Sequence, residues 1–270
     1  MFSGASEADR SQDSFKHFYD KQKRHKRIIT SKKAYAIRGP KYMYNQTQFL
    51  EIHMPVSEVI AKSKELGVSL TSYMGALLMM SIYKDMPALK RSQPISISIP
   101  VNLRNYYPSQ TTRNFFNSVN VAHVFKHDDT LESVAKDFQL KLKELLTPEA
   151  VAARMDNFEN LENYLFIRMT PLFIKNPVVN FVTKRNSKRV TATFSNLGRL
   201  SLPEGTDAFI QSYAAFCSTS TLFIVCSTYK DELVLGVSNA YRNTSFLKDY
   251  VKNFTDANIP VTVYASDIVE

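Results

Sequence analysis

The chain has 270 residues, 44% of them hydrophobic, and a formal net charge of +9. This length suits one large α/β domain or two small ones, and the apolar content is ordinary for a protein with a core. No apolar run approaches the roughly 20 residues of a membrane span, and the polar N-terminus lacks the apolar segment of a secretion signal. The only cysteines, Cys217 and Cys226, lie in apolar, strand-like runs, which predicts buried thiols and a cytoplasmic protein.

The positive charge is concentrated in two stretches. Residues 16–33 hold eight Lys or Arg residues against one acid, and the sequence KRNSKR occupies residues 184–189. Such runs can bind nucleic acid or anionic lipid, but a solvated linker is the commoner role, and no nucleic-acid recognition motif accompanies them. We therefore predict a mobile basic N-terminal arm or linker at residues 1–33, a folded part at residues 34–270, and no nucleic-acid partner.

Capping and periodicity signals predict the elements of the first third of the chain. Gly67 and Ser69 mark helix boundaries, because glycine often ends a helix and serine often caps the next one. The helix after Ser69 has apolar residues on more than one face, so it should be well buried. In chain order we expect a short helix at 13–24, a short strand at 34–37, a strand at 46–54 and helices at 55–65 and 70–85.

Similar signals continue toward the C-terminus. Asp129 to Glu132 has the pattern of a capping box, and Thr147-Pro148 and Thr170-Pro171 each place a capping threonine before proline. We expect one helix that ends near Leu146 and further helices at 148–164, 172–184 and 244–254; the helix at 172–184 should be kinked at Pro177. Strands are expected at 190–194, 210–217, 222–228, 233–238 and 259–264. A hairpin is expected at Lys230 to Glu232. This order predicts an α/β fold with a mixed β-sheet flanked by helices.

Residues 94–124 are the segment around which we interpret the chain. Residues 95–101 alternate β-branched side chains with serines, and residues 117–125 return to an apolar pattern, so both predict strands. A polar crossover containing Arg104 and Arg113 lies between them. The pattern leaves two interpretations open: these arginines face a ligand, or they pin the crossover to backbone carbonyls.

Two stretches carry a resemblance to a known family. PVNLRNYYPSQTTRNFFNSVNV (residues 100–121) resembles the central segment of alcohol-acetyltransferase-like proteins, and SNLGRLSLPE (residues 195–204) resembles a later segment of them. These proteins belong to the chloramphenicol acetyltransferase and condensation-domain superfamily. The resemblance runs from about residue 13 to the C-terminus. It implies the C-terminal lobe of a two-lobed, chloramphenicol-acetyltransferase-like fold, with an acyl-transfer tunnel between the lobes.

The resemblance also implies a site. It places both segments beside the tunnel, and the implied substrate- and cofactor-facing residues are Asn102, Arg104, Asn117, Ser118, Ser195 and Asn196. Acyl-coenzyme A, such as acetyl-coenzyme A, is implied as a co-substrate, and a small alcohol or amine as the acceptor. We expect no tightly bound cofactor. The sequence has no CxxC, HExxH or glycine-rich phosphate loop, so neither a metal nor a nucleotide-binding fold is expected.

The family's catalytic motif does not occur in the sequence. Related acyltransferases use HxxxDG, whose imidazole takes the proton from the acceptor. The histidines here are His17, His25, His53, His123 and His127, and none begins such a motif. His53 and His123 lie in predicted strands, where a packed, hydrogen-bonded role is the default. In the family the motif belongs to an N-terminal lobe that precedes the segment matching residues 13–24, so we predict a truncated chain without the catalytic base.

Three functional classes follow from these observations. The first is the C-terminal part of an acyl-thioester-dependent O- or N-acyltransferase, inactive alone and able to pair with the missing lobe or with itself. The second is a non-catalytic binding or pairing module, because loss of a lobe would expose apolar surface. The third, a basic nucleic-acid-associated protein, has no recognition motif in its favour. We predict the first class, with the second as the alternative and the absent HxxxDG motif as the feature that separates them.

Overall fold

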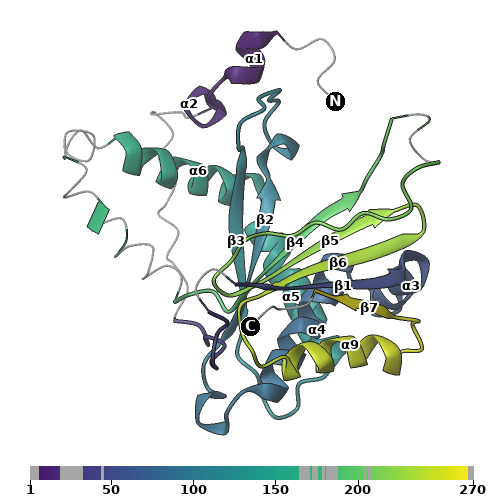
Figure 1. Ribbon diagram of the computed structural model, residues 1–270. Helices are drawn as coiled ribbons and strands as arrows, with labels where there is room; N and C mark the ends of the chain where they lie inside the picture. The colour runs from purple at the N-terminus through teal and green to yellow at the C-terminus, as the bar shows by residue number, and fades with distance from the viewer. Residues whose placement is uncertain are drawn as a thin grey trace. The chain divides into compact units, whose positions relative to one another are not determined.

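The chain forms a seven-stranded mixed β-sheet in the strand order β3-β2-β4-β5-β6-β1-β7 (Figure 1). The computed structural model describes residues 6–18, 33–43, 46–163, 171, 176–177, 180, 188–203, 205 and 208–266. The strands are β1 (Gln48–Pro55), β2 (Ile95–Asn102), β3 (Phe116–His123), β4 (Ala192–Arg199), β5 (Leu222–Tyr229), β6 (Glu232–Asn239) and β7 (Thr262–Ala265).

Parallel and antiparallel pairings both occur in this sheet. Strand β4 is parallel to β2 and to β5, whereas β5, β6, β1 and β7 pair antiparallel in that order. The predicted mixed sheet is therefore confirmed. The predicted hairpin is confirmed too: β5 and β6 are joined after Tyr229 pairs with Glu232, and Lys230 in the turn has a φ of 54°, as tight hairpin turns require.

The helices agree closely with the sequence signals. They are α1 (Glu7–Ser11), α2 (Ser14–Phe18), α3 (Val56–Glu65), α4 (Leu70–Asp85), α5 (Leu131–Leu145), α6 (Pro148–Asn163) and α9 (Ser245–Asp256), with 3₁₀ turns η1 (Ala88–Lys90) and η2 (Leu103–Asn105). Gly67 follows α3 with a φ of 68°, and the Ser69 hydroxyl accepts a hydrogen bond from the Ser72 N–H at the start of α4. Thr147 likewise accepts from the Ala150 N–H. Most of the predicted helix at 172–184 lies outside the described residues; residues 176–177 and 180, which are described, are helical.

The chain divides into two compact units. One comprises residues 1–31, 100–119 and 142–187, and the other comprises residues 32–99, 120–141 and 188–270. In the first unit Leu103, Phe115 and Val151 are buried together, and Phe15 of α2 packs its ring edge-on against Phe115 at 5.1 Å between centroids. Residues 7–11 and 14–18 of the predicted arm are thus helical. The predicted division at residue 33 stays a prediction, because residues 19–32 lie outside the described part of the chain.

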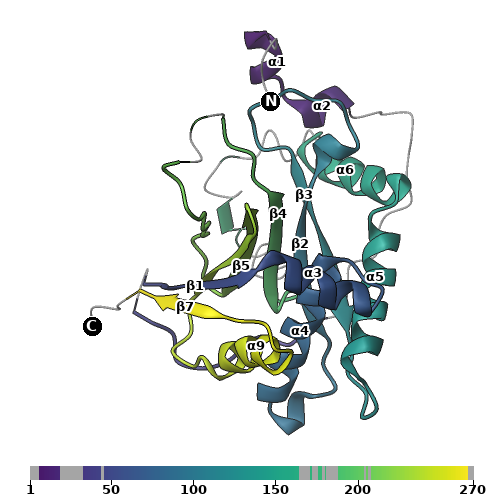
Figure 2. The ribbon, with the colours of Figure 1, turned by 90° about the vertical axis from the view of Figure 1, so that its right-hand side faces the viewer.

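In the second unit, α4 and α9 lie side by side on one face of the sheet (Figures 1 and 2). Residues that pair across strands point to the same face, so the strand register shows to which face of the sheet each side chain points. The helix face includes Phe194, Asn196, Ile224 and Leu235; Asn196 donates a hydrogen bond to Thr71 of α4 at 3.0 Å. The opposite face includes Thr193, Ser195, Val225, Ser227, Gly236 and Ser238.

Helix α4 is buried on nearly its whole circumference, as predicted. Residues 72–79 are all buried, and Tyr250 of α9 donates a hydrogen bond to the Met74 carbonyl at 3.4 Å. Gly75 leaves room for the Phe138 ring of α5, since a Cβ there would come within 2.6 Å of a ring carbon.

No single helix within the described ranges is both long enough and apolar enough to cross a bilayer. Only α3 and α4 taken together, a pair bent by 83°, meet those two criteria of length and composition.

Two predicted features near the sheet are wrong. Residues 34–37 are not a strand, because they make single backbone hydrogen bonds, from the Ala34 N–H to the Lys188 carbonyl and from the Tyr35 N–H to the Pro94 carbonyl, in place of a ladder. The predicted capping box at the start of α5 is shifted by one residue. Thr130 and Ser133 cap the helix reciprocally, and this leaves the Asp129 carboxylate for other partners.

The predicted strand at 210–217 is also wrong, although this segment does lie on the sheet. Its residues have no regular strand structure, and it contacts the opposite face through two side chains: Ser227 donates to the Tyr213 carbonyl at 2.9 Å, and Ser238 accepts from the Cys217 N–H at 3.2 Å. A Cβ at Gly236 would overlap the Ala215 carbonyl oxygen. Glycine in β6 therefore makes room for this backbone to cross the sheet.

We expect Gly236→Ala to lower the free energy of unfolding by about 1–3 kcal/mol, because the added methyl group forces the crossing segment or β6 to shift. Urea unfolding measures the change. The control is Ser227→Ala, which removes the hydrogen bond to Tyr213 without adding volume and should cost about 1 kcal/mol or less. A Gly236→Ala variant as stable as the wild type would contradict the close approach.

Candidate functional site

The six predicted site residues fall into two groups. Asn102, Arg104, Asn117 and Ser118 belong to the first unit, and Ser195 and Asn196 belong to the second. A single cleft that holds all six stays a prediction.

The structure brings Asn102 and Arg104 together. The Asn102 side chain accepts hydrogen bonds from the Arg104 backbone N–H at 3.1 Å and from its guanidinium at 3.4 Å. The guanidinium also donates to the carbonyls of Thr111 and Arg113, at 2.8 and 2.9 Å. Arg104 therefore ties both ends of the crossover together, which is the structural interpretation that the sequence left open for it. The Arg113 side chain donates no such hydrogen bonds among the described residues.

Asn117 and Ser118 are neighbours on β3. The Asn117 side chain is half-buried and accepts a hydrogen bond from the Ser118 backbone N–H at 2.7 Å, whereas Ser118 is exposed. No hydrogen bond joins this pair to Asn102 or Arg104 among the described residues. The two pairs are thus separate local arrangements on one polar segment.

Ser195 and Asn196 point to opposite faces of β4, because successive side chains in a strand alternate. The Asn196 amide is committed to structure on the helix face: it donates to Thr71, and its oxygen accepts from the Gly198 N–H at 2.9 Å across a bulge. Ser195 is half-buried on the opposite face, and its hydroxyl has no hydrogen-bond partner among the described residues. Of these two side chains, only that of Ser195 has no hydrogen-bond partner in the described part of the chain.

The opposite face carries further hydroxyls that the sequence analysis did not select. Ser98 pairs with Thr193, so these residues share that face with Ser195, and Ser96 lies two residues before Ser98 on the same strand. Ser96 is 1% exposed and its hydroxyl has no hydrogen-bond partner. No partner is found within the described residues for the side chains of Ser98 and Thr193 either. The alternating serines of residues 95–101 were the sequence signal for this row.

His53 on β1 is held between two carboxylates. Its Nδ1 lies 2.9 Å from Glu232 and its Nε2 lies 3.0 Å from Glu51, and its side chain is 11% exposed. Burial lowers the pKa of His53, but the hydrogen bonds to Glu232 and Glu51 outweigh this and raise the pKa overall. Both ring nitrogens of His53 are therefore engaged by carboxylate oxygens.

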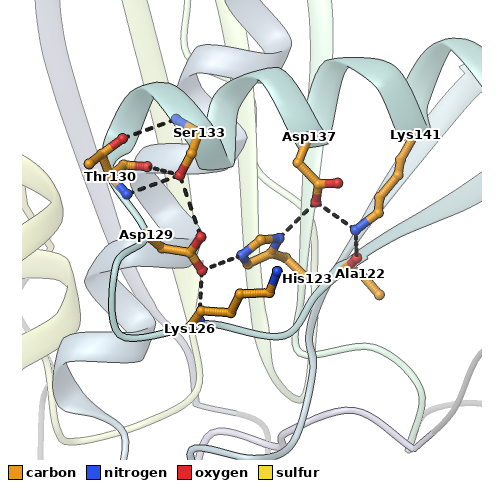
Figure 3. A network of polar contacts seen from close by, with 8 residues as sticks. All are labelled: Ala122, His123, Lys126, Asp129, Thr130, Ser133, Asp137 and Lys141. Carbon is orange, nitrogen blue, oxygen red and sulfur yellow. Dashed lines mark hydrogen bonds and ion pairs between the residues drawn. The ribbon is translucent and has the colours of Figure 1, made fainter.

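His123 occupies a similar position in a larger network (Figure 3). Its Nδ1 lies 2.7 Å from Asp137 of α5, and its Nε2 lies 2.8 Å from Asp129. Asp129 also accepts a hydrogen bond from the Lys126 backbone N–H at 2.7 Å. The Lys141 ammonium donates both to Asp137, at 2.5 Å, and to the Ala122 carbonyl, at 2.9 Å. Burial raises the pKa of both aspartates, but these hydrogen bonds outweigh it and lower the pKa of each.

A pocket of about 380 Å³ opens beside this network. It is lined by Pro94, Ala122, His123, Val124, Lys126, Asp137 and Lys141. The described residues contain no group of His, Cys, Asp and Glu side chains that could hold a metal ion. The network could not be predicted from the sequence, because His123 and Asp137 are 14 residues apart and belong to different elements.

Comparison with known proteins identifies the family. A model of the alcohol acetyltransferase family matches residues 14–244. The chain belongs to the alcohol acetyltransferase family. No curated protein sequence gives a significant match.

Solved structures share the fold of this alcohol acetyltransferase family member at low sequence identity. Trichothecene 15-O-acetyltransferase TRI3 from Fusarium sporotrichioides has a TM-score of 0.52 and 14% identity, over 82% of this chain and 48% of that chain. Polyketide synthase associated protein 5 from Mycobacterium tuberculosis has a TM-score of 0.50 and 14% identity, over 84% and 55%. The nonribosomal peptide synthetase FmoA3 gives 0.53 and 12%, over 83% and 24%. The chain thus spans about half of the length of the first two, and its fold is that of chloramphenicol-acetyltransferase-like and condensation-domain acyltransferases.

We expect Arg104→Ala to reduce the free energy of unfolding by about 1.5–3 kcal/mol, because its guanidinium donates charge-assisted hydrogen bonds to two crossover carbonyls. Amide exchange over residues 105–114 should also become faster. Arg113→Ala is the matched control and should change neither measurement appreciably. Equal effects of the two substitutions would contradict the bracing role of Arg104.

We expect the contribution of His53 to stability to depend on pH. Because its pKa is raised in the folded state, the contribution is fully present below the unfolded pKa of about 6.5 and is lost as pH rises through the folded pKa. The stability gap between wild type and His53→Gln, measured by urea unfolding, should therefore be larger at pH 5.5 than at pH 9. His17→Gln, at an exposed position, is the control. A gap that is constant with pH would argue against a protonated His53.

Proposed function

We propose that the chain is part of an acyl-thioester-dependent O- or N-acyltransferase and that it requires a catalytic histidine from outside its own sequence. The observation that carries the acyltransferase assignment is the family match over residues 14–244. Acyl-coenzyme A serves as the acyl donor in this proposal, and a small alcohol or amine serves as the acceptor. The partner that supplies the histidine is a lobe that bears the HxxxDG motif. Self-association is the alternative form of pairing, and it would leave the chain without the base.

The geometry of the histidines supports the need for an outside base. General base catalysis requires an imidazole nitrogen with a free lone pair near the acceptor. Both ring nitrogens of His53 and of His123 face carboxylate oxygens. His17 and His127 are exposed, and His25 lies outside the described residues. No histidine begins an HxxxDG sequence, so none matches the base of the family.

The hydroxyls on the opposite face of the sheet support a substrate-facing role for this surface. Thr193 and Ser195 are half-buried, and their hydroxyls are free among the described residues. Hydroxyls both donate and accept hydrogen bonds, so they can orient the amide groups of an acyl thioester or the hydroxyl of an acceptor. We assign Ser195 to the substrate-binding residues of the proposed enzyme. Asn196, whose amide is committed to Thr71 and Gly198, positions β4 against α4.

A non-catalytic pairing module is the second candidate, and exposed apolar side chains favour it. Phe116 on β3 is 50% exposed, and Leu197 on β4 is 49% exposed; each lies next to a predicted site residue. Exposed apolar groups beside a predicted site are suited to contact another protein. The two candidates differ in one measurable way, because only the enzyme gains acyl-transfer activity on pairing.

The proposal includes the cytoplasm as the compartment. Cys217 and Cys226 are both free thiols, which persist in reducing compartments. Cys226 is buried as predicted, and burial raises its pKa to about 12, so it stays an unreactive thiol. Cys217 is only partly buried, which corrects the expectation of two buried thiols, because its segment crosses the sheet without joining it.

We expect the chain alone to release no thiol from acetyl-coenzyme A above background when simple alcohols are supplied. A positioned base contributes about 10²–10⁴-fold, and its loss alone should bring turnover close to the uncatalysed rate. Addition of a family N-terminal lobe bearing HxxxDG should restore turnover, and the same lobe with its motif histidine changed to alanine should not.

The reconstituted activity also tests the assignment of β4. With the lobe at saturating concentration, Ser195→Ala should raise the KM for donor or acceptor severalfold. Leu197→Ala, which removes an exposed apolar side chain, should leave that KM unchanged and alter at most the concentration of lobe needed. Turnover by the lone chain that disappears in His53→Ala or His123→Ala would overturn the proposal. Pairing without any turnover would favour the non-catalytic module.

A further inference from the structure

We propose that the pocket beside His123 binds a short-chain monocarboxylate. This site lies within the second unit and does not depend on the proposed function. Its position is set by α4: Thr71 at the start of that helix contacts Asn196, whereas Tyr83, near its end, stacks on Phe125 at 4.2 Å, just beyond His123. Twelve residues of helix separate these two contacts, which is about 18 Å. The pocket is therefore remote from the hydroxyls of β4.

An ammonium group without a carboxylate partner calls for an anion. Among the described residues Lys141 is paired with Asp137, whereas Lys126, which also lines the pocket, makes no ion pair. The Asp129 carboxylate faces the His123 ring and the Lys126 backbone N–H instead. Asp128, in the same loop, does not line the pocket, and Glu132 is paired with Lys136.

Donors remain available to hold the anion. An ammonium group has three N–H donors, and Lys141 uses two of them, for Asp137 and the Ala122 carbonyl. The Lys126 ammonium makes no ion pair among the described residues, and its stem reaches along the network in Figure 3. A carboxylate between Lys126 and Lys141 would accept from both. The fixed position of Lys141, tied to β3 and α5, gives one end of this clamp a defined geometry.

The walls select the kind of anion. Pro94, Ala122 and Val124 form an apolar side of the pocket, which suits a short hydrocarbon chain. The volume of about 380 Å³ is at the lower end of the range of about 300–1,000 Å³ for small-molecule sites. Asp137 also lines the pocket, and its carboxylate repels a second negative charge on a ligand. A monocarboxylate such as butyrate meets these conditions better than a phosphate dianion.

The test is an NMR titration of the full chain, labelled in its histidine rings, with sodium butyrate at constant ionic strength and pH 7. We expect saturable shifts of the His123 ring signals, while those of His53, which is also held between carboxylates, stay unmoved. The neutral analogue butyramide should give no shift. Lys126→Met retains the backbone N–H that binds Asp129 and should weaken apparent butyrate affinity about 3- to 10-fold, as expected for a partly exposed charge.

Lys136→Met is the matched control, because Lys136 lies on α5 and pairs with Glu132 away from the pocket. Its butyrate affinity should equal that of the wild type. Shifts that grow without saturation, or that appear equally at His53, would show adventitious ion binding and overturn the proposal. Tighter binding of inorganic phosphate than of butyrate would overturn the monocarboxylate assignment, as would an unchanged affinity in Lys126→Met.

Discussion

The alternation of side chains along the central strands is the constraint on which the second unit depends. Strands β4, β5 and β6 are paired on both sides, so each residue is committed to the helix face or to the opposite face. On the helix face this commitment buries apolar groups such as Phe194, Ile224 and Leu235. On the opposite face it aligns hydroxyls from different strands. The same rule separates Ser195 from Asn196, although the two are adjacent in sequence.

Elements set by local chemistry could be predicted from the sequence. Ser69, Gly67 and Thr147 fix helix boundaries through contacts within a few residues, and the hairpin after Tyr229 needs only a two-residue turn. The order of such elements was enough to predict a mixed sheet. The strands predicted at 34–37 and 210–217 failed because strand composition does not show whether a neighbouring backbone is free to pair. Their actual contacts come from residues distant in the sequence.

The candidate site could be predicted only in part, for a similar reason. The resemblance selected polar residues on two segments, but it could not separate groups that contact substrate from groups that hold the chain. Arg104 and Asn196 both make hydrogen bonds that secure local structure. The partners of His53 and His123 could not be predicted either, since Glu232 is 179 residues from His53 and Asp137 lies on another element. Side-chain chemistry limited the possible roles of each histidine, and tertiary structure decided between them.

The crossing of residues 213–217 over β5 and β6 has a consequence for how the protein folds. The segment is held by hydrogen bonds from Ser227 and Ser238 and by the space above Gly236, and it takes no part in the strand ladder. Its docking surface exists only after the β5–β6 hairpin has formed, and that hairpin closes through a short local turn. We therefore expect the hairpin to form before the crossing segment docks. By the same reasoning, this part of the chain should detach in a local opening that leaves the sheet intact, at a smaller free energy than global unfolding.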